Sequence, residues 1–566
     1  MDRRKKTTQS KSAFVIWRKR FSKTVKADPV SFAIWITAAV LLFGAIAFYL
    51  TGFVKQNISG EAFYDFQYPY LFPFSESWKI FFLDRIQSRL MHGVFVSALF
   101  HVFGFNPPVY YLIGLILVIC NATLITLVLR SFIKLPWISV LLVATFTWLP
   151  LNIPDLMVLK KLHHALAWFA FWLAVFLWQK WFEKKRIFSL LAAALAFLAS
   201  ILSYEVAIAL FPVAVFITLP KLKDVRDFIG YLGMSIWITF LSGLAFLNLE
   251  GVKRFSRVES LSAIGGWDLG YLVNSSLSLL SKLPAAIWNS GLRENPSGIQ
   301  DAVGKTILVI TVIGLFGVIR QFFRKKNRIQ EKFSLVLTGL WLGVAAYLPF
   351  ILAGQAPDSD SLRGAAFGTV FIVLAATSWI VEQGKKVLGN LFLTGICLFW
   401  ICTGFIYYAQ GVMSSKQEDL ILQNVVVTLK KQVPDVAEGT NFIFVNSGVG
   451  RTGCIGFVNM LYDRSKLHCI HLLSGDTQES YTRTDAGLVE TGGRLWPERF
   501  IIVTFDDQGR VTVLDQLDQD DFEILPVTWE SIKPLVTNRS LIYPDVTSSG
   551  RNFDFYNYMM EQYLSR

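Results

Sequence analysis

The chain has 566 residues, of which 53% are hydrophobic and 17% are charged. A soluble protein would not carry so many uncharged apolar runs of about 18–22 residues, so the composition indicates a polytopic membrane protein. The net charge of +13 does not indicate nucleic-acid binding, because the Lys and Arg residues cluster between the apolar runs, where they determine topology.

The first 28 residues form a basic tail, dense in Lys and Arg from Arg3 to Lys26, which we expect in the cytoplasm. The apolar run that follows Pro29 extends to Val54. This run is too long for the core of a signal peptide, and no small-residue cleavage site follows it. We therefore predict a retained first transmembrane helix.

Run length predicts a mainly α, polytopic fold with about eleven transmembrane helices in a domain over residues 29–410. The basic connections between these runs all lie on the side of the N-terminal tail if all eleven helices exist, and omitting any helix would break this pattern. The expected spans are roughly 31–53, 109–129, 136–152, 163–181, 187–202, 205–220, 228–248, 302–322, 333–353, 364–382 and 387–410.

Residues 411–566 have a soluble composition and are predicted to form an α+β domain outside the cytoplasmic (inner) membrane. A helix is expected at about 417–432. The apolar runs at Phe442–Val445 and Phe500–Thr504 predict strands, and the second should form a hairpin with Arg510–Leu514 across a polar turn. Cys454 and Cys469 lie in this region, and the sequence leaves open whether they are bridged.

The exterior loops, chiefly 54–108 and 249–301, carry ionisable residues on one side of the membrane. Asp65 lies in an aromatic-rich segment of the first loop. His163 and His164 open the fourth predicted helix, Glu205 opens the sixth, and Arg363 precedes the tenth. Several ionisable groups that converge on one face suggest a functional site.

The N-terminal half also resembles a known family. The segments that carry the resemblance are Arg89-Leu-Met-His-Gly, the run from Leu99 to Pro108 with Phe-Gly-Phe-Asn-Pro-Pro, and Ser203-Tyr-Glu205 followed by Pro212. Over about residues 30–220, these segments resemble the GT-C glycosyltransferases, which use polyprenyl-phosphate sugars and include protein O-mannosyltransferases and lipid A aminoarabinose transferases. The chain departs from the family in having one Asp at position 65 instead of an acidic pair, and Gln87-Ser-Arg89-Leu instead of Gly-Arg-Pro.

The resemblance implies an inverting transfer of a sugar from a polyprenyl phosphate to an extracytoplasmic acceptor, with membrane lipid around the donor. Asp65 would accept the proton of the acceptor hydroxyl. The expected phosphate-binding residues are Arg363, Arg89, Arg85 and Lys161. The expected supporting residues are Glu61, Glu205, His163 and His164.

Simpler structural roles stay open for each of these residues. Asp65 could cap an interfacial helix or pair with Arg85, and Arg363 could anchor a helix end at the interface. No cofactor is indicated. A divalent metal is not indicated either, because the adjacent His163 and His164 point in different directions along a helix and lack zinc-type spacing.

Other functions also stay open. The run from Asn446 to Gly453 looks like a phosphatase phosphate loop, but Val445 occupies the position of the nucleophilic thiol. An envelope polysaccharide polymerase or ligase would depend on Arg254, Arg257 and Arg293 in the loop 249–301. A transporter or scaffold is the non-enzymatic alternative, although no repeat between the two halves indicates a transporter.

Overall fold

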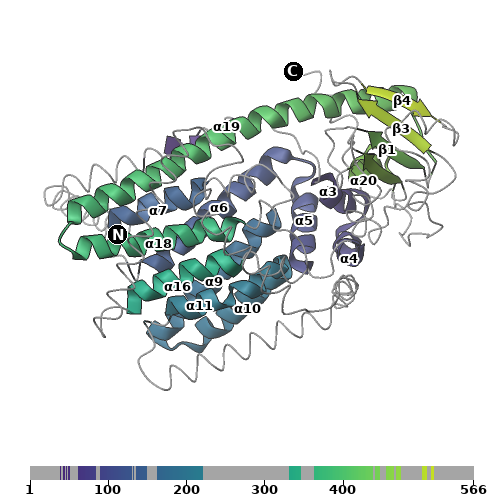
Figure 1. Ribbon diagram of the computed structural model, residues 1–566. Helices are drawn as coiled ribbons and strands as arrows, with labels where there is room; N and C mark the ends of the chain where they lie inside the picture. The colour runs from purple at the N-terminus through teal and green to yellow at the C-terminus, as the bar shows by residue number, and fades with distance from the viewer. Residues whose placement is uncertain are drawn as a thin grey trace, which may run out of the picture.

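The computed structural model shows a helical bundle that continues into a small four-stranded sheet (Figure 1). Isolated residues between 39 and 52, and residues 132 and 220, are also described. The main described ranges are 62–84, 89–130, 136–149, 162–218, 330–345, 362–437, 440–445, 454–464, 467–472, 500–505 and 511–515.

Most predicted spans within these ranges are helices of the bundle. Their bounds are α6 Pro107–Leu129, α7 Pro136–Trp148, α9 Leu162–Lys184, α10 Ile187–Ser203, α11 Phe211–Thr218, α16 Gln330–Ala345, α18 Leu362–Glu382 and α19 Lys386–Gln432. In the described part of the chain, α6, α9 and the section Lys386–Met413 of α19 are long and apolar enough to cross a membrane. The predicted spans 228–248 and 302–322, the tail 1–28 and the loop 249–301 lie outside the described residues.

The local sequence explains several helix ends. Pro107 opens α6 directly after Asn106, where proline costs no helical hydrogen bond. The span predicted to reach residue 152 ends as α7 at Trp148, shortly before Pro150, because the residue before proline disfavours helical geometry.

The span predicted at 205–220 begins as a 3-10 helix, η3 (Glu205–Leu210), and becomes α-helical only at Phe211. Pro212 explains this break, since its ring and missing N–H oppose α-helix in the preceding turn.

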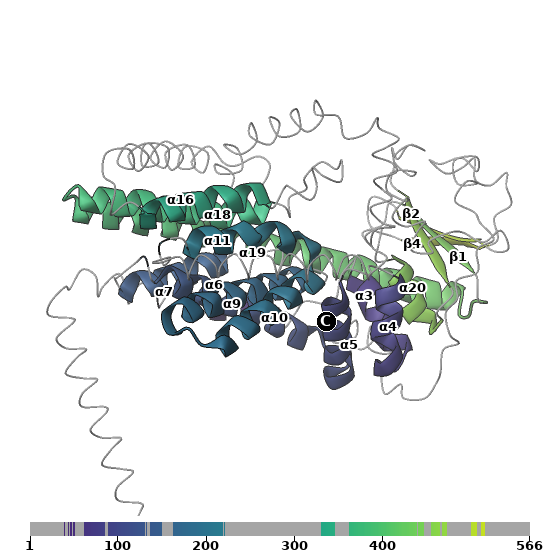
Figure 2. The ribbon, with the colours of Figure 1, turned by 90° about the horizontal axis from the view of Figure 1, so that it is seen from below.

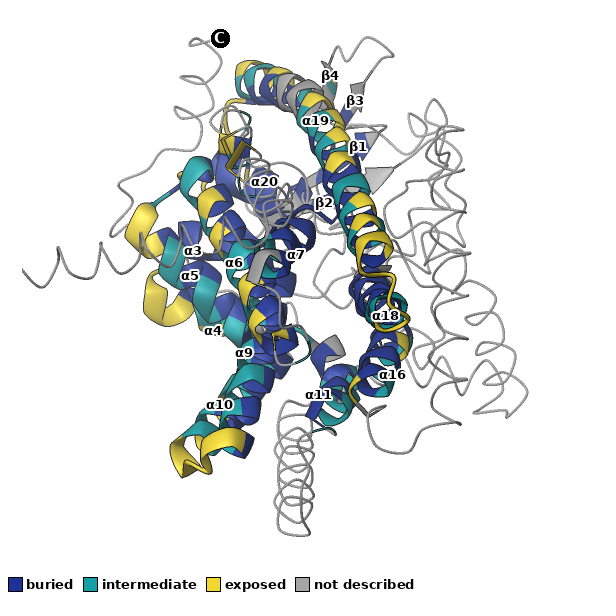
Figure 3. Cartoon of the chain, turned by 90° about the vertical axis from the view of Figure 1, so that its left-hand side faces the viewer, coloured by how far each residue is buried: buried dark blue, intermediate teal, exposed yellow. Residues whose placement is uncertain are grey.

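Close packing and polar bonds between helices hold the bundle together. Asn121 of α6 donates to the carbonyl of Ala165 at 3.0 Å, and Ser200 of α10 donates to the carbonyl of Ala167 at 2.7 Å. Both α6 and α10 are therefore hydrogen-bonded to α9. Interhelical hydrogen bonds of this kind and small residues drive helix association in lipid. Large apolar side chains such as those of Leu195 and Phe188 stay exposed on the outer surface of α10, as expected for a lipid-facing surface (Figure 3).

Three short helices lie between the bundle and the sheet: α3 (Ala62–Leu71), α4 (Phe74–Asp84) and α5 (Leu90–Phe103) (Figure 2). They belong to the predicted first exterior loop. Within α3, every residue whose side chain is described is buried. The α3 segment of the loop is therefore packed into the protein.

Helix α19 runs without a break from the bundle to the sheet (Figure 1). The helix predicted at about 417–432 is its C-terminal section, and the predicted domain boundary at 410–411 falls inside it. A continuous helix makes the connection between the two parts stiff, because bending it would break backbone hydrogen bonds.

The sheet has the order β2-β1-β3-β4, with β1 Asn441–Val445, β2 His468–Leu472, β3 Phe500–Phe505 and β4 Val511–Asp515. The antiparallel pairing of β3 with β4 confirms the predicted hairpin. The sequence did not predict β2, which pairs in parallel with β1 through the crossover helix α20 (Cys454–Tyr462). This part of the predicted α+β domain is thus a β-α-β unit with a hairpin added.

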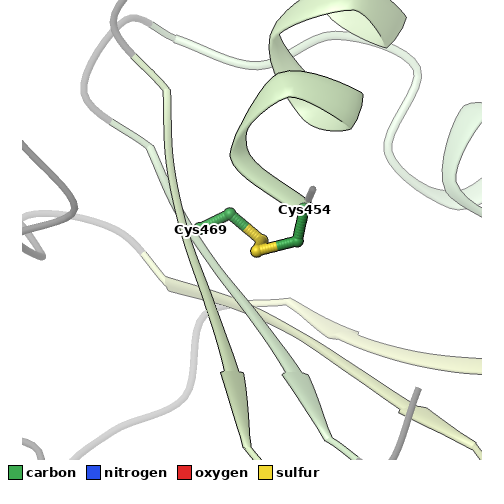
Figure 4. The surroundings of a disulfide bond; sticks show 2 residues. All are labelled: Cys454 and Cys469. Carbon is green, nitrogen blue, oxygen red and sulfur yellow. A yellow bond between two sulfur atoms is a disulfide. The ribbon is translucent and has the colours of Figure 1, made fainter. Parts of the chain in front are cut away.

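A disulfide joins Cys454, at the start of α20, to Cys469 of β2 (Figure 4). It ties the crossover helix to the edge strand. The bond also removes the thiol nearest the phosphatase-like run, in agreement with the absence of a nucleophile from that motif.

Candidate active site

A buried carboxylate–histidine pair forms the centre of the candidate site. Asp65 of α3 accepts a hydrogen bond from His92 of α5, with 3.1 Å between Oδ2 and Nε2. Both residues are almost fully buried, at 2% exposure each. Helix α3 presents Asp65 to α5 because the adjacent Phe66 packs against Phe100 of α5 and Tyr110 of α6.

The first turn of α5 also supplies a cation. Arg89, which precedes α5, donates from one guanidinium nitrogen to Nε2 of His163 at 3.1 Å. Arginine can only donate, so Nε2 of His163 is the acceptor and this histidine is the neutral tautomer with its proton on Nδ1. The guanidinium carbon of Arg89 lies 4.8 Å from the centre of the Tyr204 ring, a cation–π distance.

Aromatic contacts join the two polar pairs. The rings of His92 and His163 lie 4.9 Å apart, and those of His163 and His164 lie 4.1 Å apart. His164 in turn stacks on Tyr204, with 4.4 Å between ring centres. Residues from α3, α5, the first turn of α9 and the end of α10 therefore form one connected cluster, which we call the His–Arg–Asp cluster: Asp65, Arg89, His92, His163, His164 and Tyr204.

The cluster lies at one defined end of the bundle. Helix α9 has His163 and His164 in its first turn and Lys184 at its end. Lys185 and Arg186 follow before α10 returns to Tyr204. The basic connection between α9 and α10 is therefore separated from the cluster by the full length of both helices.

The predicted site residues fall into three groups. The structure brings together Asp65, Arg89, His163 and His164. Glu205 opens η3 directly after Tyr204, and Arg363 lies in the first turn of α18, but their side chains are not among those described. The remaining three predicted residues, Glu61, Arg85 and Lys161, lie outside the described residues.

Sequence reasoning missed two members of the cluster. His92 follows Arg89 by three residues at the start of an apolar helix, a spacing that places both on one side of its first turn. Tyr204 lies between Ser203 and Glu205, the two residues that carry the sequence resemblance at this turn. It is the last position before η3, with an extended backbone that directs the chain back toward α9. Both positions are visible in the sequence. Neither can be distinguished from a packing position until the residues that contact His92 and Tyr204 are known.

The cluster is rich in histidine but is not arranged as a metal site. Among the described residues, no group of three or more His, Cys, Asp or Glu side chains is placed to hold a metal ion. The contact with Arg89 occupies the lone pair of Nε2 of His163 and places a positive charge beside it.

No protein-family model matches the sequence, and no curated protein matches it. Among solved structures, the chain is similar to the crystal structure of ArnT from Cupriavidus metallidurans in the apo state, with 11% sequence identity and a TM-score of 0.39. The match covers 89% of this chain and 100% of that one. A TM-score at this level does not establish a common fold.

Proposed function

We propose that the chain is a membrane glycosyltransferase that moves a sugar from a polyprenyl phosphate to an extracytoplasmic acceptor. The observation that carries the proposal is the His–Arg–Asp cluster, in which His92 and His163 connect a buried carboxylate to an arginine at one end of a helical bundle. Glycosyl transfer from a phosphate needs a base for the acceptor and a cation for the leaving group. The family resemblance of the segments around Arg89 and Glu205 supports the same reaction.

In the proposed reaction, the acceptor hydroxyl oxygen attacks the anomeric carbon of the donor and forms the new glycosidic bond. The bond from that carbon to the phosphate oxygen breaks, and the phosphate keeps the electron pair. The acceptor proton passes to Asp65. One in-line displacement without a covalent enzyme intermediate inverts the anomeric configuration, and it requires only one base.

His92 has a positioning role in this scheme. Its N–H group donates to Oδ2 of Asp65 and so fixes the orientation of the carboxylate. A hydrogen bond donated to an ionised carboxylate also stabilises its negative charge. This hydrogen bond favours the anionic form that a base requires.

Arg89 is the proposed contact for the departing phosphate. A guanidinium stays charged and offers a planar set of donors that suits phosphate oxygens. Neutral His163 and the Tyr204 ring hold it in place without neutralising it. Arg363, Arg85 and Lys161 are proposed as further phosphate ligands.

The remaining predicted residues are assigned to the acceptor side or to support. His164, stacked on Tyr204, and Glu205, the next residue along the chain, are proposed to orient the acceptor. Glu61 is proposed to support Asp65 from the segment that enters α3. These assignments rest on position along the chain and on the packing of Tyr204.

The proposed site faces the exterior of the inner membrane. Basic connections remain in the cytoplasm by the positive-inside rule, and the connection after Lys184 lies at the opposite end of the bundle from the cluster. The Cys454–Cys469 disulfide supports the same orientation for the C-terminal part. The N-terminal tail is then cytoplasmic.

The test removes the base while preserving its shape. A strain that lacks the gene is complemented with Asp65→Asn, and its lipid extract is analysed by mass spectrometry for an unused polyprenyl-phosphate sugar. We expect this lipid to accumulate, as in the uncomplemented strain, with normal amounts of protein in the membrane. The control is Glu183→Gln, which removes an exposed carboxylate paired with Lys180 at the opposite end of α9 and should restore transfer.

The outcomes separate the alternatives. Full transfer by Asp65→Asn would refute the assignment of the base. A polymerase or ligase would instead lose activity on substitution of Arg254, Arg257 or Arg293 and produce chain-length defects. A strain without any accumulated lipid-linked sugar would favour a transporter or scaffold.

A further inference from the structure

Helix α3, which carries Asp65, is enclosed between two parts of the protein. Asp65 and Phe66 point toward the bundle side, where they contact His92 and Tyr110. A second face consists of Phe63, Gln67 and Tyr70, which are spaced by four and three residues and therefore share one side of the helix. Tyr70 lies at the edge of this face, since its ring also contacts that of Phe100 of α5, with 6.4 Å between ring centres. This second face is covered by α20 of the C-terminal part (Figure 2).

The contacts between α3 and α20 are specific. Asn459 donates from Nδ2 to Oε1 of Gln67 at 2.8 Å, and both side chains are buried. The hydroxyl group of Tyr70 donates to Oδ1 of Asp463 at 2.6 Å, a short bond to a charged acceptor. Phe63 packs edge-on against Phe457, with 5.4 Å between ring centres.

Helix α20 is itself held firmly. Oδ1 of Asn459 accepts the backbone N–H of Leu467 at 3.1 Å, just before β2. Tyr462 donates to the carbonyl of Val433 at 2.9 Å, which connects α20 to the end of α19. With the disulfide from Cys454, these bonds fix α20 to the sheet and to the helix that enters the bundle.

Helix α3 cannot hold its own position. It has 10 residues and includes Pro69, and isolated helices shorter than about 12–15 residues are marginal in water. Its conformation must come from packing on both faces. Packing against α5 places the carboxylate, and the contacts with α20 and Asp463 support the helix from a second side.

We propose that the C-terminal domain positions the catalytic base, through Asn459 of α20 and Asp463 directly after α20, which hold Gln67 and Tyr70 of α3. This inference rests on the proposed function. Asn459 and Asp463 are positioning residues, since they act on Asp65 only through α3. Through these two residues, the domain supports the transferase site.

The experiment cuts one bond of this interface at a time. Tyr70→Phe removes only the donor hydroxyl group. Asp463→Gly removes the acceptor and suits the backbone, because Asp463 has a φ of 54°. Asp463→Asn keeps an acceptor oxygen and tolerates the same backbone conformation. Tyr408→Phe is the matched control, since it also removes a buried tyrosine hydroxyl bond, but one within the bundle, to the carbonyl of Tyr49 at 3.0 Å.

Three quantities are measured for each full-length variant: transfer in the complemented strain, affinity for polyprenyl monophosphate in detergent, and backbone hydrogen exchange over residues 62–71. Polyprenyl monophosphate is the part that all such donors share. We expect Tyr70→Phe and Asp463→Gly to lower transfer about 10-fold or more, because a displacement of about 1 Å between reacting groups costs on the order of 100-fold. Their affinity for polyprenyl monophosphate should be unchanged, and exchange over α3 should be faster.

Asp463→Asn should keep both transfer and protection, and Tyr408→Phe should leave both normal. A wild-type rate in Tyr70→Phe, or an equal loss in Tyr408→Phe, would overturn the proposal. If Tyr70→Phe does not accumulate in the membrane, Asp463→Gly decides the same question with α3 unchanged.

The result also separates this inference from the proposed function. If Asp65→Asn transfers normally, the proposed function fails, whereas the exchange data still show whether α20 holds α3. If Asp65→Asn is inactive and Tyr70→Phe is fully active, only the positioning by the domain is refuted.

Discussion

The hydrogen bond from His92 to Asp65 gives the sharpest test of the site, because its removal can be matched by a substitution that preserves it. In His92→Phe, the ring that packs against His163 is kept and the N–H group is lost. In His92→Gln, a side-chain amide N–H can reach the same carboxylate oxygen. The two variants therefore differ mainly in whether a donor faces Asp65.

The expected loss follows from the burial of the pair. Asp65 and His92 have side-chain exposures of 2% and 3%, so solvent cannot replace the missing donor. A hydrogen bond to a charged group contributes about 1.5–3 kcal/mol. If this stabilisation is needed to orient the base in the transition state, its loss corresponds to roughly a 10- to 150-fold lower rate, at about 1.4 kcal/mol per factor of ten.

The assay is transfer in the complemented strain, followed by single-turnover kinetics on purified protein once the donor has been identified from the lipid extract. His92→Phe should be strongly impaired, and His92→Gln should recover most of the rate. Equal rates in His92→Phe and the wild type would refute the role of the pair. Equal impairment of both variants would show that the imidazole ring matters for packing and that its N–H group does not.

Three further predictions concern the cation, the bundle and the disulfide. Arg89→Lys keeps a positive charge but loses the planar fork, so binding of polyprenyl monophosphate should weaken by about 1.5–3 kcal/mol, the range for a charge-assisted hydrogen bond, measured by titration in detergent. Gly339→Ala should destabilise the bundle by roughly 1–3 kcal/mol in a thermal melt, because the new Cβ would lie 2.6 Å from the carbonyl oxygen of Gly368, whereas Gly395→Ala meets nothing within 4 Å and should be neutral. Joint replacement of Cys454 and its partner by Ser should cost about 3 kcal/mol for the 15-residue separation and expose the C-terminal domain to limited proteolysis, with reductant giving the same effect on the wild type.

The helices of the bundle could be predicted from sequence because the length of an apolar run is a local property. It can be read without knowing which other segment the helix packs against. α6, α9 and α10 lie within a few residues of their expected positions. The hairpin of β3 and β4 could be predicted for the same reason, since both strands and their turn are contiguous. The strand β2 could not, because a five-residue run with two histidines gives a weak pattern and its parallel partner lies across a helix.

The candidate site was predictable only residue by residue. Sequence position placed Asp65, Arg89 and the two histidines of α9 on one side of the membrane, but it could not say which would touch. Asp65 and His92 are 27 positions apart, and Arg89 and His163 are 74 apart. These contacts depend on how the helices pack together, and the local hydrophobic periodicity does not predict helix packing. His92 reads as one polar residue on an apolar helix until Asp65 is placed beside it.

One helical turn sets the spacing of the proposed chemistry. Arg89 and His92 stand three residues apart at the start of α5, which corresponds to a rise of about 4.5 Å. Reacting atoms in a productive complex approach to about 3–3.5 Å, so the acceptor oxygen beside Asp65 and the phosphate oxygen beside Arg89 must lie on opposite sides of one anomeric carbon. Because one rigid turn carries both the residue that holds the base and the cation itself, any tilt of α5 would move them together. Helix α5 does not fix the position of α3, which carries the base itself. In our proposal, the C-terminal domain holds α3 in place.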